Sequence, residues 1–299
     1  MPTYKEPVFI VGMPRSGTTL VQGILCNTKK YFPMPETHFF VRATYNLPEK
    51  NLSKENLKRI RRKLLKKSRI KIDREFPNDL TTQKDIFEYL VDQFNTDGSL
   101  TFLEKTPRHV FFYSKILEYY PDAKFICMIR EPKNVVSSQL TNSPKKNKSV
   151  IRLSLLYNKI TTAILNIRNN NNVYTIKYED LTTETEMVLK NTCNFLNLPY
   201  ASKLVDNVAA PPEIVSSHEF WKKKNIDQEM IQKNKADKWR KALSPGQANI
   251  INFITKSHAE KFEYDLPYEW TQILSGFGQD ILRLFSPSEF KKAFSKYHG

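Results

Sequence analysis

The chain has 299 residues and carries 47 Lys and Arg against 31 Asp and Glu, which gives a formal net charge of +16. Its 40% hydrophobic and 26% charged residues exclude a fibrous or disordered protein and suit a globular domain with an ample core. The excess of positive charge indicates an anionic partner.

No apolar stretch approaches the roughly 18 residues that a membrane span needs. The first residues lack the apolar segment of a signal peptide, so we expect a cytoplasmic protein without a membrane span. Cys26, Cys127 and Cys193 lie in apolar segments without the spacing of metal ligands. This pattern predicts buried free thiols, no disulfide and no metal site.

A strand, a glycine-bounded loop and a helix open the chain. Residues 8–11 form a short apolar run ended by Gly12, which predicts a buried strand of a parallel sheet. After the loop, residues 18–26 place four apolar side chains on one face of a predicted helix.

Two similar units follow. Residues 124–129 and 173–177 predict further buried strands, and helical patterns cover 133–140 and about 185–196. Strands that alternate with helices predict an α/β fold, a P-loop-like doubly wound parallel sheet flanked by helices. Such sheets bind ligands at the carboxyl ends of their strands.

Helical insertions separate these units, and we treat residues 1–299 as a single domain. Residues 53–74 are dense in Lys and Arg with apolar residues at helical spacing, which predicts a basic helical insertion. Its basic face is either solvated or a contact surface for an acidic substrate. Ser244, followed by Pro and Gln, predicts another helix start, and residues 270–299 predict a C-terminal helical tail.

The segment from Gly12 to Thr19 reads GMPRSGTT and has two glycines at the separation of a phosphate-cradling loop. Its place between a strand and a helix lets backbone amides and the helix dipole face an anion. Nucleoside triphosphatases carry a Lys directly after the second glycine, where Thr18 stands here. With Arg15 as its only cation, the loop is predicted to hold a phosphate-like group without the usual triphosphate and magnesium geometry.

The string PRSGTT resembles the 5′-phosphosulfate loop of the sulfotransferases that use 3′-phosphoadenosine 5′-phosphosulfate (PAPS). The likeness is to the branch that contains the protein-tyrosine sulfotransferases and many bacterial relatives. It implies that the loop residues bind the donor, namely Pro14, Arg15, Ser16, Gly17, Thr18 and Thr19.

A second element of that family is an Arg just past a later strand, followed by a Ser about eight residues on. Arg130 and Ser138 match this pattern, and the resemblance implies that they hold the 3′-phosphate of the donor. An Arg at a strand end offers two parallel hydrogen bonds to a phosphate. The alternative for Arg130 is an ion pair with Glu131 or another acid.

The segment Glu36-Thr37-His38 resembles the Glu-Thr pair that supplies the general base in this branch, which implies Glu36 as the base. A carboxylate near the acceptor hydroxyl can take its proton as the oxygen attacks sulfur, typically worth about 10² to 10⁴ in rate. His38 is the competing base, because the cytosolic small-molecule branch uses His and imidazole titrates closer to neutral pH. A merely structural Glu36 would cap a helix or pair with Arg42.

Lys105 ends an apolar strand in the run LTFLEKTP, just before a predicted helix. The resemblance implies that Lys105 contacts the transferred sulfuryl group, and that Arg15 helps to stabilise charge on the leaving phosphate. Removing one such donor typically costs about 10² to 10³ in rate. A Lys at a strand end would otherwise be a solvated surface charge.

Two further segments resemble the family. The segment from Tyr178 to Leu181 looks like a strand-end element, to which we assign an architectural role. Residues 233–241 loosely resemble the loop that closes over the nucleotide, so Lys235 is a further candidate ligand. The Arg-Lys-Gly-x-x-Gly closure of the cytosolic branch is missing.

These observations predict a sulfotransferase with PAPS as co-substrate, adenosine 3′,5′-bisphosphate (PAP) as product and no metal. The acceptor would offer a hydroxyl or an amine, and its class and the oligomeric state stay open. The alternative enzyme is a P-loop kinase, which would need ATP and magnesium. A nucleic-acid-binding module is a third reading, but the basic run lacks interleaved stacking aromatics, so we expect no specific nucleic-acid partner.

Overall fold

The computed structural model describes residues 4–68, 70, 72, 75–95, 101–141, 149–206, 208, 231, 238–274 and 276. The chain divides into two compact units. Unit 1 comprises residues 1–128 and 166–234, and unit 2 comprises residues 129–165 and 235–299. The single domain over residues 1–299 stays a prediction.

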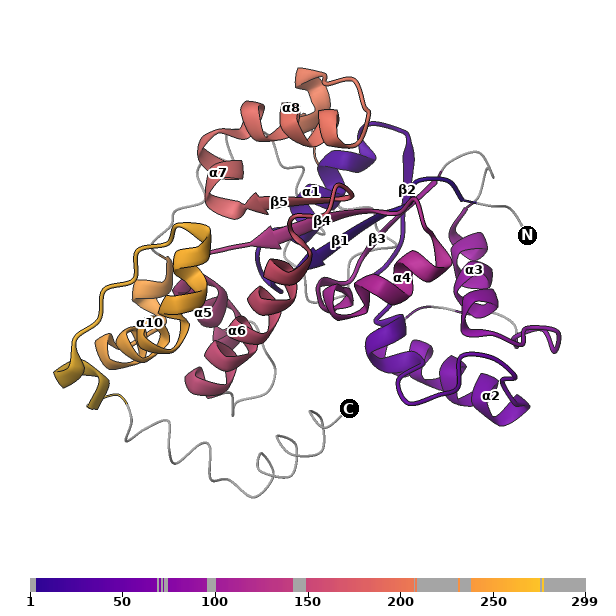
Figure 1. Cartoon of the computed structure of the whole chain (residues 1–299), viewed down its shortest axis with the longest axis horizontal. Helices are drawn as coiled ribbons and strands as arrows, with labels where there is room; N and C mark the ends of the chain where they lie inside the picture. The colour runs from indigo at the N-terminus through magenta and orange to yellow at the C-terminus, as the bar shows by residue number, and fades with distance from the viewer. Residues whose placement is uncertain are drawn as a thin grey trace. The chain divides into compact units, whose positions relative to one another are not determined.

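A five-stranded sheet of order β2-β3-β1-β4-β5 forms the centre of unit 1 (Figure 1). Its strands are β1 (Val8–Gly12), β2 (Tyr31–Pro33), β3 (Thr101–Lys105), β4 (Lys124–Ile129) and β5 (Val173–Lys177). β1 runs parallel to both β3 and β4, and β2 runs parallel to β3. The predicted α/β fold with a central parallel sheet is therefore confirmed.

The strand order puts β1 in the middle, with β3 on one side and β4 on the other. The chain passes from β1 to the edge strand β2, returns to β3 beside β1, and then crosses to β4 and β5 on the other side. The loop after β1 therefore begins at the point where the direction of winding changes. Open α/β sheets bind their ligands at such a point. The topology alone makes the loop after Gly12 the place to look for a ligand.

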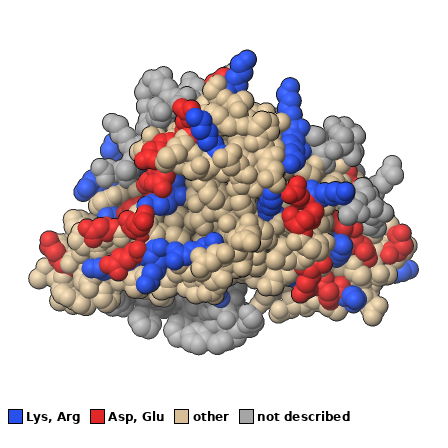
Figure 2. Space-filling model, turned by 45° about the horizontal axis from the view of Figure 1, so that its top comes forward, with Lys and Arg blue, Asp and Glu red and all other residues tan. Residues whose placement is uncertain are grey.

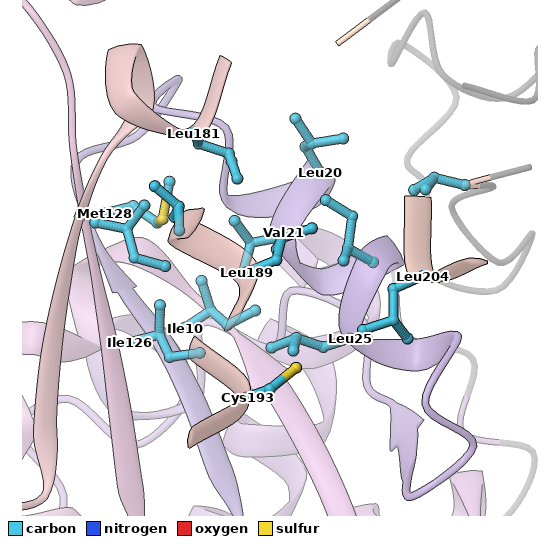
Figure 3. Packing of buried hydrophobic residues seen from close by; sticks show 14 of the residues in the cluster. Ile10, Leu20, Val21, Leu25, Ile126, Met128, Leu181, Leu189, Cys193 and Leu204 are labelled. Atoms are coloured by element: carbon cyan, nitrogen blue, oxygen red, sulfur yellow. The ribbon is translucent and has the colours of Figure 1, made fainter. Parts of the chain in front are cut away.

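One face of the sheet packs on α1 (Thr18–Cys26) and α8 (Thr185–Phe195). Side chains alternate between the two faces along a strand, so Val8 and Ile10 of β1 point to this side. Figure 3 shows the cluster they belong to, whose labelled members include Ile10, Leu20, Val21, Leu25, Ile126, Met128, Leu189 and Cys193.

The opposite face carries an aromatic cluster. Phe9, Phe102 and Phe125 alternate with the residues of the first face, and Phe9 contacts the ring of Phe87 at 6.4 Å between centroids. Phe87 comes from α3 (Gln83–Phe94), and Tyr120, which directly follows α4 (Tyr113–Tyr119), packs on Phe102. Burying a side chain of this size stabilises the fold by about 1.5–3 kcal/mol.

Three predicted elements of unit 1 have the expected bounds. α1, β4 and β5 begin and end where the sequence pattern predicts, and α8 ends one residue early. β2 was not predicted, because three residues are too few to show a period. The remaining elements are η1 (Phe39–Ala43), α2 (Lys54–Lys63), η2 (Leu64–Ser68), η3 (Pro107–Phe112), α7 (Tyr178–Thr183) and η4 (Ser202–Val205).

The predicted helix over residues 53–74 is too long. α2 starts at the N-cap Ser53, whose hydroxyl accepts from the backbone amide of Asn56, and it ends at Lys63. A π-helical turn, η2, continues to Ser68. Beyond it, the backbone amide of Ile70 donates to the carbonyl of Leu64, six residues earlier, and Ile70 and Ile72 are both buried.

Unit 2 is helical. It contains α5 (Pro132–Thr141), η6 (Lys238–Lys241), α10 (Pro245–Ala259), η7 (Glu260–Phe262) and most of α6 (Val150–Ile167). The capping box predicted at Ser244 is confirmed, since its hydroxyl accepts from the amide of Gln247 and its own amide donates to the Gln247 side chain. Residues 270–274 are helical, as the tail pattern predicts, whereas residues 277–299 lie outside the described residues.

The three cysteines are free thiols. Cys127 and Cys193 are buried as predicted, and Cys26 is only half-buried. Burial raises the pKa of the Cys26 and Cys127 thiols to about 12, so neither forms a thiolate near neutral pH.

Candidate functional site

The loop between β1 and α1 depends on two glycines in the left-handed region. Gly12 has φ 115°, and a side chain there would clash with the backbone carbonyl of Met128 on β4. Gly17 has φ 89°, and a Cβ there would lie 2.5 Å from the ring of Tyr178. Because Tyr178 lies against the loop in this way, its position fits the architectural role predicted for its segment.

The loop ends in an uncapped helix. Gly17 is the N-cap of α1 and no side chain accepts from the first turn, so the first amides of α1 have no intrahelical acceptor. Arg15 is exposed and also has a positive φ of 73°. These amides lie at the positive end of the helix dipole, next to a cation, which suits an anionic ligand.

The side chains of the other predicted loop residues differ in how far they are buried. Pro14 and Thr19 are half-buried, and Thr18 is buried. Ser16 is fully buried, and its hydroxyl donates to the carbonyl of Met13. The Ser16 side chain therefore contacts the loop itself, and its role in binding the donor stays a prediction.

Glu36, His38 and Lys105 lie together. The Lys105 ammonium is 3.3 Å from Oε2 of Glu36, and Nε2 of His38 is 3.6 Å from Oε1 of the same carboxylate. Lys105 is only 2% exposed, whereas the Glu36 side chain is 33% exposed. Lys105 is thus a buried charge with a carboxylate partner, which is different from the solvated lysine expected at an ordinary strand end.

Strand pairing brings this group beside the loop. Lys105 is the last residue of β3 and pairs in register with Ile10 of β1, two residues before Gly12. The carboxyl ends of neighbouring parallel strands meet at one edge of the sheet, so Lys105 lies at the edge where the loop begins.

The Glu36 carboxylate is held in its charged form. Burial raises its pKa, but the nearby Lys105 ammonium, followed by His38, outweighs that effect and the net pKa is below the usual range. Burial lowers the pKa of His38 to about 4, against an opposing effect of Glu36. At neutral pH the site therefore presents a carboxylate and a neutral imidazole, and the 3.6 Å separation between them is too long for a hydrogen bond.

A second carboxylate, Glu104, lies fully buried behind this group. Its Oε1 accepts from the hydroxyls of Thr37 at 2.8 Å and Thr106 at 2.6 Å, and its Oε2 is 3.0 Å from Nδ1 of His109. Burial raises the pKa of Glu104, but His109 and these hydrogen bonds outweigh it and lower the pKa. Glu104 is therefore ionised and satisfied inside the protein, as a buried carboxylate must be.

Glu104 links the two segments that carry the site. It accepts from the side chain of Thr37, between Glu36 and His38, and from that of Thr106, next to Lys105. The Thr106 hydroxyl oxygen in turn accepts from the backbone amide of His38 at 3.2 Å. One carboxylate thus fixes the relative position of residues 36–38 and 104–106.

Sequence reasoning missed Glu104 and its partners. The available signal was a carboxylate within an apolar strand, at a position that alternation places on the same face as Phe102. A buried charged side chain needs a partner, so a carboxylate at this position already indicates a specific interaction.

Unit 2 holds the second pair of predicted residues. Arg130 directly follows β4 and its carbonyl accepts from the Tyr157 hydroxyl at 3.2 Å, while Ser138 is half-buried on α5. Glu131 forms an ion pair with Lys133 at 3.3 Å.

A second cation, Lys238, lies near Arg130. Burial and then the charge of Arg130 lower the pKa of Lys238, so two like charges lie near each other here. The ring of Trp239 lies 4.5 Å from the Lys133 ammonium and 4.6 Å from the Arg240 guanidinium. Lys235 lies outside the described residues.

The structure thus brings Glu36, His38 and Lys105 together in unit 1, at the sheet edge where the predicted phosphate loop begins. It places Arg130 and Ser138 in unit 2.

Within the described ranges, no cluster of three or more His, Cys, Asp or Glu could hold a metal ion. In the same part of the chain, no helix is long and apolar enough to cross a membrane.

Comparison with known proteins places the chain among enzymes of one kind. Residues 7–202 match the family described as the sulfotransferase family. The sulfotransferase domain of the Synechococcus PCC 7002 olefin synthase superposes with a TM-score of 0.59 at 24% identity, covering 89% of this chain and 98% of that domain. The sulfotransferase domain from the curacin biosynthetic pathway gives a TM-score of 0.56 at 20% identity, covering 89% of this chain and all of that one.

Two further similarities are more distant. A sulfotransferase from Alicyclobacillus acidocaldarius superposes with a TM-score of 0.53 at 15% identity, covering 90% of this chain and 98% of that one. An uncharacterised protein of Aquifex aeolicus (strain VF5) is 24% identical over 220 residues, which are 68% of this chain. The matched region spans only 27% of that longer relative.

Proposed function

The chain belongs to the sulfotransferase family, and from this premise we propose that it transfers a sulfuryl group from PAPS to a hydroxyl or amine of an acceptor. The observation that supports this most is the Glu36–Lys105 pair at 3.3 Å, at the sheet edge where the PRSGTT loop begins. This pair would supply a base, Glu36, and next to it a cation for the leaving phosphate, Lys105.

The donor would bind through both of its phosphate ends. The uncapped amides of α1 and the Arg15 side chain hold the 5′-phosphosulfate, as helix N-termini hold phosphates. Arg130 and Ser138 hold the 3′-phosphate. Lys238 joins them as a candidate, since it lies close enough to Arg130 for the two charges to interact and an anion between them would relieve the repulsion. Lys235 stays a prediction.

The reaction is an in-line displacement. The acceptor oxygen or nitrogen bonds to sulfur, the bond from sulfur to the bridging phosphate oxygen breaks, and PAP leaves with that electron pair. Glu36 takes the acceptor proton, while Lys105 and Arg15 balance the charge on the bridging oxygen and phosphate. When Lys105 contacts the donor, Glu36 loses its main charge partner and becomes a stronger base.

His38 is the second candidate for the base. Its imidazole is neutral near pH 7, because burial lowers its pKa to about 4, so it has a lone pair to accept a proton. We favour Glu36 because its carboxylate is 33% exposed, against 16% for the His38 side chain, and can meet an incoming acceptor more directly.

The deciding experiment is calorimetric binding of PAP and of ATP, each with EDTA and moderate salt. We expect PAP to bind tightly and ATP feebly, because Thr18 stands where a kinase carries its phosphate-binding Lys. Tighter binding of ATP, or binding of neither nucleotide, would contradict the proposal. Such a result would favour a P-loop kinase or a nucleic-acid-binding module instead. A cytoplasmic location and the absence of a nucleic-acid partner stay predictions.

The surface charge is consistent with a local rather than a general anion site. On the face shown in Figure 2, acidic and basic side chains are interspersed, so this face does not form a single positive surface. Nonspecific polyanion binding over that face is therefore not favoured.

A further inference from the structure

A row of four cations runs along α2 and η2. Lys54, Lys58, Arg62 and Lys66 are spaced four residues apart, and all four are exposed. Residues at this spacing are neighbours on a helix, and like charges so placed destabilise it. Within the described residues the structure shows no ion pair to any of the four. The row therefore opposes helix stability, and no ion pair in the described part of the chain offsets this repulsion.

The row forms one wall of a pocket of about 520 Å³. Leu57, Leu65 and Phe76 supply apolar surface in the same pocket, and Glu75 is its single acidic side chain. Leu57 is 6% and Phe76 is 7% exposed and Leu65 is half-buried, so the apolar side chains are recessed relative to the exposed cations. Pockets that hold small ligands measure about 300–1,000 Å³. The size, charge and apolar floor suit one molecule with an anionic and an apolar part.

This pocket is structurally connected to the Glu36–His38 segment. η1 begins at the residue after His38, and both α2 and η2 pack against η1. The Lys63 ammonium also donates to the backbone carbonyl of Ala43, the last residue of η1, at 3.5 Å. A ligand in the pocket would therefore sit on elements that pack on η1, which directly follows the segment carrying the candidate base.

We propose that this pocket recognises the acceptor, and that the acceptor is an amphiphilic molecule bearing phosphate or carboxylate groups. Its anionic groups pair with Lys54, Lys58, Arg62 and Lys66, and its apolar part packs on the recessed side chains. This inference rests on the proposed function and names the substrate class for it.

Two other anionic partners fit the pocket less well. A uniformly charged polyanion would leave the apolar floor unused. A membrane surface would need apolar side chains that protrude, as on interfacial amphipathic helices, whereas Leu57 and Phe76 are buried.

The test is binding of octyl phosphate, with 1-octanol and inorganic phosphate as probes of its two halves. We expect octyl phosphate to bind at least ten-fold tighter than either half. The double variant Lys58→Glu/Arg62→Glu should weaken that binding ten-fold or more. The matched control Lys5→Glu/Lys203→Glu changes the net charge equally at two exposed lysines outside the pocket and should leave binding unchanged.

The variant should fold, because each new Glu stands four residues from Lys54 or Lys66 and forms a favourable pair. The two new carboxylates repel each other, but this single repulsive pair replaces the three of the wild type. Circular dichroism checks this. PAP binding, measured on the same samples, should be equal in the wild type and in both variants. If the wild type fails to bind PAP, the proposed function fails, whatever the pocket binds.

The pocket proposal itself is overturned by any of four results obtained while PAP binds normally. Inorganic phosphate could match octyl phosphate, which would mean an adventitious ion only. The affinity for 1-octanol could equal that for octyl phosphate. The control variant could lose as much affinity for octyl phosphate as the pocket variant does. Finally, vesicles with anionic lipid could bind the wild type while octyl phosphate does not.

Discussion

The Lys105 ammonium lies 3.3 Å from the Glu36 carboxylate, although 69 positions separate the two residues in the chain. The pairing of β3 with β1 positions Lys105, and the hydrogen bonds of Glu104 hold the segment of Glu36 against it. The pair therefore depends on the tertiary fold, and its electrostatics can be tested directly.

Replacing Lys105 by Met should lower donor turnover by about 10² to 10³, because a preorganised cation is removed. It should also shift the acid limb of the pH profile to higher pH. Lys105 is the main charge that lowers the pKa of Glu36, so without it the effect of burial, which raises that pKa, dominates. The rate of PAP formation from PAPS, measured from pH 4 to pH 8, checks both effects. Lys84→Met, which removes an exposed lysine, is the control. An unshifted acid limb would contradict the proposed coupling.

Glu36→Gln and His38→Gln together assign the base. We expect Glu36→Gln to slow the single-turnover reaction by about 10² to 10⁴ while PAP affinity is kept, since the carboxylate acts on the acceptor. His38→Gln should have the smaller effect. Rapid-quench kinetics with calorimetry on the same samples separates chemistry from binding, and the reverse order of the two losses would make His38 the base.

Glu104→Gln should change how stability depends on pH. The folded-state pKa of Glu104 is lowered, so its charge stabilises the fold above its unfolded pKa of about 4.3, and that stability is lost as pH falls through the folded pKa. The wild type should therefore lose stability below about pH 4 more steeply than Glu104→Gln. At pH 7 the variant should be less stable by about 1–3 kcal/mol, because the amide disturbs hydrogen bonds that a buried carboxylate satisfied.

Urea unfolding at several pH values measures both parts of this prediction. Glu186→Gln serves as the control, since the Glu186 side chain is 62% exposed. Parallel pH dependences of the wild type and Glu104→Gln would mean that folding does not lower the pKa of Glu104 and would contradict the prediction. A positioning role also requires that Glu104→Gln lower kcat much more than PAP affinity.

Arg130→Ala should weaken PAP much more than adenosine 5′-phosphate, because only PAP carries the 3′-phosphate. A charge-assisted hydrogen bond contributes about 1.5–3 kcal/mol, so a loss of roughly ten- to a hundred-fold in PAP affinity is expected. Calorimetry with the two nucleotides measures this difference, with Lys159→Ala as a control for lost charge. Equal losses for both nucleotides would place Arg130 away from the 3′-phosphate.

The sequence alone determined the features that depend on neighbouring residues. The apolar run of β1, the two glycines and the face of α1 follow from local sterics and periodicity, and all appear at the predicted positions. The same is true of the capping box at Ser244. Each such pattern is complete within a few residues, so it can be read without knowledge of the fold.

Only the tertiary structure decided which charges meet. Glu104 looked like one more residue of a strand, and the fold makes it the centre of the hydrogen bonds that join Thr37, Thr106 and His109. The basic segment is helical through α2 and η2 only as far as Ser68 rather than to residue 74, and Ile70 and Ile72 beyond it are buried. The contact of Glu104 with Thr37 spans 67 residues and that of Lys105 with Glu36 spans 69, so no local pattern encodes them.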